Sequence, residues 1–114
     1  MKSSSCVRAL KFPSGHVDDD FKINNDVDFV VFWNNRNIRR KLPGDVVLSW
    51  KHFLDKLPAE ERKNCLMIMK TPPVDNNGTD LIEVLKWNCP NAEVLFIPER
   101  LAEEDMNMLY NMAD

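Results

Sequence analysis

The sequence predicts an α/β domain in which parallel strands alternate with helices, and three observations support this. Three short apolar runs, at residues 27–33, 65–69 and 93–97, have the length and composition of buried strands. Each run is followed by a segment whose apolar residues recur at helical spacing. The 114 residues, 44% of them apolar and 29% charged, fit one globular domain with one core. This alternation gives the order βαβαβα and a parallel sheet, because a parallel return needs a crossover connection.

The first strand and the helix after it are predicted from composition and from proline positions. In residues 27–33, β-branched and aromatic side chains predominate, which indicates a strand buried on both faces. A helix over about 43–57 follows, because Pro43 is tolerated in a first helical turn and the Asp45 carboxylate is favourable there. Pro58 ends this helix, and a charged connection leads to the second strand. Residues 1–25 are expected to form a loop or linker, and residues 26–114 the domain.

The second half of the chain repeats this alternation. After the second strand, either Thr79 or Asp80 can cap a helix that ends at the Cys89-Pro90-Asn91 segment. The third strand is closed by Pro98, and the last helix begins with three acidic residues. Asn77-Gly78-Thr79 matches a glycosylation acceptor, but no secretory signal precedes it, so we predict a turn.

Composition excludes several classes of protein. Fifteen Lys or Arg against eighteen Asp or Glu give a net charge of -3, which argues against a general nucleic-acid binder. No apolar stretch could span a bilayer, and we expect a cytoplasmic protein. The odd number of cysteines, without a Cys-x-x-Cys pair, favours reduced thiols over a disulfide framework or a zinc site.

The strongest local signal is a basic segment directly after the first strand. Residues 36–41 carry four cations, Arg36, Arg39, Arg40 and Lys41. Ligands of open parallel sheets bind at the carboxyl ends of strands, and the N-terminus of a helix there also favours an anion. A phosphate or diphosphate is therefore the natural ligand, since Arg and Lys together can hold it. Two alternatives remain: an ordinary solvated loop, and a site for an RNA or DNA backbone.

The segment from Phe29 to Pro43 resembles the first strand and loop of the nucleotide-sugar-binding domain in GT-B glycosyltransferases of the broad group-1 family. That family has an apolar strand, a small residue, Arg, four residues and Lys, and Arg36 and Lys41 keep this spacing. Asn35 stands where many members have Gly. Weaker matches occur in order, at residues 15–21, 92–97 and 109–114, so that the likeness covers about residues 13–114.

This resemblance implies a Rossmann-like, three-layer parallel sheet that is half of a GT-B C-terminal domain. It further implies a retaining glycosyltransferase that transfers a sugar from a nucleoside-diphosphate donor without a metal or other cofactor. Arg36 and Lys41 would be its catalytic and diphosphate-binding residues, and Ile97 and Arg100 possible contacts of the base. The chain ends before the family's Glu-Gly-Phe-Gly segment and lacks its acceptor-binding domain. We therefore expect a fragment that is inactive alone; the alternative is a non-catalytic α/β binding or interaction module.

The remaining candidate residues are interpreted as structural. His16 and His52 are the two histidines, and no metal site is expected because such a site needs three or more converging ligands. His16 stays a weak candidate on the acceptor side. Residues 18–20, three aspartates, lack the Gly and the distal Glu of a calcium loop and predict a solvated turn. The methionines at strand and helix positions predict core packing.

Overall fold

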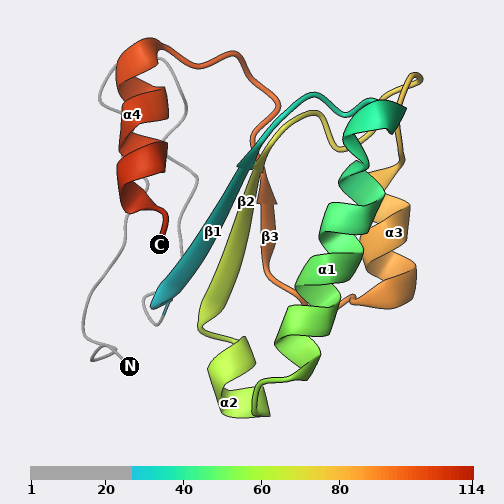
Figure 1. Cartoon of the computed structure of the whole chain (residues 1–114), viewed down its shortest axis with the longest axis vertical. Coiled ribbons are helices and arrows are strands. Elements are labelled where there is room, and N and C mark those ends of the chain that lie inside the picture. The colour runs from blue at the N-terminus through green and yellow to red at the C-terminus, as the bar shows by residue number, and fades with distance from the viewer. Residues whose placement is uncertain (1–26) are drawn as a thin grey trace.

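A computed structural model describes residues 27–114, and Figure 1 shows their arrangement. Along the chain come β1 (Phe29–Asn34), the 3₁₀ turn η1 (Arg39–Lys41), α1 (Pro43–Asp55), α2 (Ala59–Arg62), β2 (Cys65–Lys70), α3 (Leu81–Asn88), β3 (Val94–Phe96) and α4 (Glu103–Met112). The strands form one parallel sheet in the order β1-β2-β3. The predicted α/β class is confirmed, and the arrangement is consistent with a Rossmann-like fold.

Helices cover both faces of the sheet. α1 and α3 lie on one face, and α4 lies on the other (Figure 1). Side chains on a strand alternate between the two faces, so β2 contributes to two separate cores. The core under α1 and α3 consists of Val47, Trp50, Leu54, Cys65, Met67, Met69 and Leu81, and the core under α4 of Val27, Val30, Leu66, Ile68, Ile97 and Leu109.

β2 is the central strand, and its burial reflects that position. Five of its six residues are buried, from Cys65 to Met69. Ile68 lies opposite Phe32 of β1 and opposite Leu95 of β3. Met67 and Met69 are 3% and 0% exposed, which confirms that these methionines fill the core.

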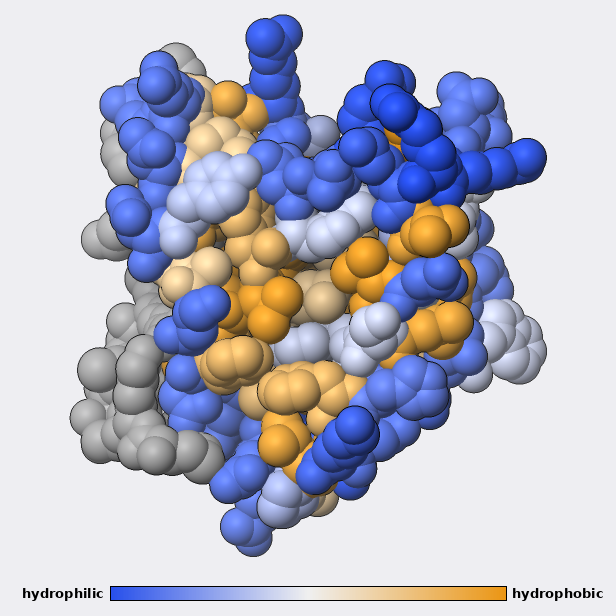
Figure 2. Space-filling view, in the orientation of Figure 1, coloured by the Kyte–Doolittle hydropathy of each residue, from blue (hydrophilic) through white to orange (hydrophobic). Residues whose placement is uncertain are grey.

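Among the strands of residues 27–114, β1 lies at an edge of the sheet, and it is less buried than predicted. Only Val30 of β1 is fully buried, and the other apolar side chains of the strand are half-buried. As predicted, the apolar side chains of β1 pack on both faces of the sheet. The predicted full burial is wrong, because a strand at the edge of the described sheet has a neighbouring strand on one side only. Figure 2 shows apolar side chains gathered on the face between α4 and α1. Asp114 caps this edge: its N–H donates to the Val30 carbonyl and its Oδ2 accepts from the Val30 N–H, both at 2.8 Å.

Several element boundaries differ from the sequence prediction. α1 ends at Asp55 rather than near Leu57, and the charged connection after it contains the helical turn α2. Asp80 rather than Thr79 caps α3, since its Oδ1 accepts from the Glu83 N–H at 3.1 Å. No helix within residues 27–114 combines the length and the apolar character that crossing a bilayer requires.

Candidate functional site

The basic segment lies at the carboxyl end of β1, directly before α1. Arg36, Arg39, Arg40 and Lys41 are all exposed there. Among the described residues none of these four cations has an ion-pair partner. Hydrophilic side chains gather at this end of α1, at the upper right of Figure 2. The loop after β1 therefore presents concentrated positive charge, which no carboxylate of residues 27–114 pairs with, at the sheet edge where ligands of such folds bind.

The N-terminus of α1 contributes less to anion binding than its position suggests. The preceding residue, Leu42, adopts a left-handed conformation (φ 51°, ψ 49°) and gives the helix no side-chain cap. Pro43 has no N–H, so the second and third helical residues, Gly44 and Asp45, supply the first free donors. The Asp45 carboxylate itself compensates the helix dipole in this turn. The cations, not the helix end, are thus the main attraction for an anion.

Asn37 ties the basic loop to the loop that follows β2. Its side chain is 1% exposed. Its Nδ2 donates to the carbonyls of Pro72 (3.0 Å) and Thr79 (2.7 Å), and its Oδ1 accepts from the Thr79 N–H (2.9 Å). The Arg39 N–H also donates to the Asn77 carbonyl at 3.2 Å. These three hydrogen bonds of the Asn37 carboxamide form the Asn37 bridge.

The partner loop turns sharply at Asn77-Gly78, as predicted. The Asn77 N–H donates to Asp75 Oδ1 at 2.8 Å, and the Gly78 N–H donates to the Asp75 carbonyl at 3.0 Å. A Cβ at Gly78 would collide with the backbone and side-chain oxygens of Asn37, so only glycine allows this approach. Sequence reasoning identified the turn but missed its partner, because Asn37 stands between cations with no pattern that marks it as buried.

α4 contacts the end of β1 from which the basic loop departs. Asn34, the last residue of β1, donates through Nδ2 to the Tyr110 hydroxyl at 3.0 Å. The Tyr110 ring packs edge-on against Phe32, with centroids 5.0 Å apart. These contacts fix the point where the basic loop leaves the strand.

The two residues expected near the base lie at the carboxyl end of β3. Ile97 is fully buried in the core under α4, and its N–H donates to the Met69 carbonyl at 2.9 Å. The whole residue is 0% exposed, so Ile97 is engaged in packing and presents no surface to a ligand in this structure. Arg100 is exposed. The likeness segments at residues 15–21, with His16, and the aspartates at 18–20 lie outside the described residues.

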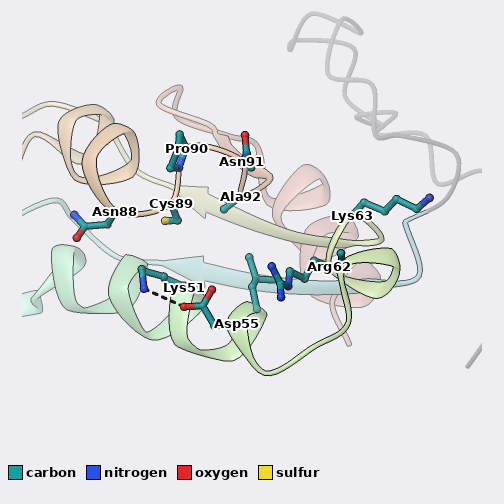
Figure 3. A pocket seen from close by; sticks show the side chains of 11 residues that line it. Lys51, Asp55, Arg62, Lys63, Asn88, Cys89, Pro90, Asn91 and Ala92 are labelled. Atoms are coloured by element: carbon teal, nitrogen blue, oxygen red, sulfur yellow. Dashed lines mark hydrogen bonds and ion pairs between the residues drawn. The ribbon is translucent and has the colours of Figure 1, made fainter.

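A cavity of about 420 Å³ lies at the opposite end of the sheet, between the C-terminal ends of α1 and α3 (Figure 3). Lys51 Nζ lies 2.9 Å from Asp55 Oδ2, and this hydrogen bond lowers the pKa of Asp55. Arg62 Nε donates to the Leu57 carbonyl at 2.8 Å. Cations near helix C-termini compensate the partial negative charge of the free carbonyls there. Compensation of the helix C-termini explains why cations line the cavity.

The described cysteines are free thiols. Cys65 is buried and Cys89, which lines the cavity, is half-buried. Burial raises the pKa of both thiols, so both are predominantly protonated at neutral pH. His52 is exposed on α1. Within residues 27–114, no three His, Cys, Asp or Glu side chains gather closely enough to hold a metal ion.

No family model, no curated protein and no solved structure matches the chain.

Proposed function

We propose that this chain binds the diphosphate of a nucleotide-sugar donor through Arg36 and Lys41, as part of a retaining glycosyltransferase. The proposal rests on one observation: four exposed cations without ion-pair partners in the described chain lie at the carboxyl end of an edge strand of a parallel sheet. The spacing of Arg36 and Lys41 and its likeness to the GT-B pattern select these two cations.

The chemistry of this role is electrostatic. A guanidinium offers a planar fork of donors to phosphate oxygens, and an ammonium offers a compact charge. When the bond between the sugar and the diphosphate breaks, negative charge grows on the leaving phosphate. Fixed cations beside that phosphate stabilise the charge more in the transition state than in the bound donor, which lowers the barrier. The base would lie toward the end of β3, near the exposed side chain of Arg100.

Single substitutions test the binding step. We expect Arg36→Ala and Lys41→Ala each to weaken binding of UDP or GDP by about tenfold or more, because each removes a charge-assisted contact worth about 1.5–3 kcal/mol. Isothermal titration with both nucleotides measures this effect. Arg62→Ala is the matched control, since it removes an exposed cation at the far end of the sheet and should leave the affinity unchanged.

Three results would count against the proposal: no binding of either nucleotide by the unmodified chain in the millimolar range, undiminished binding by both single variants, or an equal loss in Arg62→Ala. Binding that depends on Arg36 and Lys41 without sugar transfer, even when an acceptor domain is supplied, would favour the non-catalytic binding module.

A further inference from the structure

The Asn37 bridge fixes the backbone between the two cations that the proposed function uses. Arg36 immediately precedes Asn37, and its carbonyl accepts from the Ile38 N–H at 2.9 Å. The Lys41 N–H then donates to the Ile38 carbonyl at 3.0 Å, which closes the turn η1. Because Asn37 is anchored to the loop after β2, the backbone that carries both cations is held in place relative to the sheet.

The bridge is costly to break, since the Asn37 carboxamide at its centre is almost completely removed from water. The Asn37 carboxamide satisfies two carbonyls and one N–H that no other described side chain reaches. A buried polar group that loses its partner keeps its full desolvation cost. The bridge therefore persists without a ligand, so the loop geometry exists before an anion binds.

We propose that Asn37 and Gly78 are positioning residues of the anion site, which hold Arg36 and Lys41 where both can bind one diphosphate. This inference rests on the proposed function. Neither residue needs to touch the ligand. Asn37 supplies the hydrogen bonds, and Gly78 leaves the space into which Asn37 fits.

The physical benefit is preorganisation. Two long cationic side chains on a mobile loop would lose the freedom of the loop backbone as well as their own when they bind one ligand. A loop already anchored to its neighbour loses less, and the gain is largest for a ligand that needs both cations at once. A diphosphate is such a ligand, whereas a single phosphate can bind to one cation alone.

The test compares two variants of the whole chain. Gly78→Ala places a Cβ against the oxygens of Asn37 and displaces the bridge without changing any charge. Asn76→Ala is the matched control: it also changes an uncharged residue of the loop after β2, but the Asn76 side chain is exposed and takes no part in the Asn37 bridge. The affinities for UDP and UMP are measured for the unmodified chain and both variants, with circular dichroism to confirm folding.

We expect Gly78→Ala to weaken UDP binding by about tenfold while UMP binding changes little, so that the preference for the diphosphate falls. Asn76→Ala should keep both affinities. Limited trypsin digestion gives a readout that needs no ligand, and cleavage after Arg39, Arg40 and Lys41 should be faster in Gly78→Ala. If Gly78→Ala does not fold, Asn37→Ser takes its place, because its shorter side chain cannot reach both carbonyls.

Failure of the proposed function and failure of the positioning role give different results. An unmodified chain that binds no UDP overturns the proposed function and with it this inference. An unmodified chain that binds UDP, with an unchanged ratio of UDP to UMP affinity in the folded bridge variant, overturns the positioning role alone. A loss of the same size in Asn76→Ala would also overturn it, because the effect would then not depend on Asn37.

Discussion

Leu81→Ala is expected to lower the free energy of unfolding by about 2–5 kcal/mol. Leu81 is the first residue of α3, is fully buried, and packs in the core shared by α1, α3 and the sheet. Truncation to alanine removes buried apolar surface and leaves a cavity that its neighbours fill only in part. Urea denaturation, followed by circular dichroism, measures the loss.

The next residue provides the control for this change. Ile82 lies on the same helix but is 48% exposed, so Ile82→Ala should cost less than about 1 kcal/mol. Equal losses in the two variants would contradict the assignment of Leu81 to the core and of Ile82 to the surface.

The double variant Arg36→Ala/Lys41→Ala is expected to lose more than about a hundredfold in affinity for UDP and GDP. Two charge-assisted contacts together are worth about 3–6 kcal/mol, and no other cation is assigned to the diphosphate. The folded state should be unaffected, because both side chains are exposed and have no ion-pair partner within residues 27–114. Titration calorimetry at constant ionic strength measures the affinity.

Arg39→Ala/Arg40→Ala is the matched control for this double variant. It removes the same charge from the same loop, and both side chains are likewise exposed. A general attraction of the loop for anions would weaken binding equally in both double variants. If the site is specific, the affinity for UDP and GDP falls much more in Arg36→Ala/Lys41→Ala than in Arg39→Ala/Arg40→Ala.

Most helices and strands could be predicted from the sequence, because apolar runs, proline positions and capping residues indicate the same elements. The run from Cys65 to Met69 is apolar throughout, and a central strand with both faces covered requires that pattern. Pro43 and Asp80 mark the starts of α1 and α3 through backbone geometry and capping. The edge position of β1 could not be predicted, since an apolar run does not reveal how many neighbours a strand has.

The site was less predictable, for a physical reason. A dense group of cations is visible in any sequence, so Arg36 and Lys41 could be singled out. Asn37 could not, because its role depends on Pro72 and Thr79, which lie 35 and 42 residues away and meet it only when β1 and β2 pair. Burial of Ile97 depends equally on the packing of α4, whose contact with the sheet no local pattern shows.

Amide chemical shifts during a titration with UDP test the diphosphate role most directly. The result that we predict is a set of changes concentrated at residues 36–46, with smaller changes near Arg100, beside which the base would lie, and at residues 77–79, which the Asn37 bridge connects to the basic loop. No change at millimolar UDP would contradict the role, as would changes confined to the cavity beside Lys51 and Arg62 at the opposite end of the sheet.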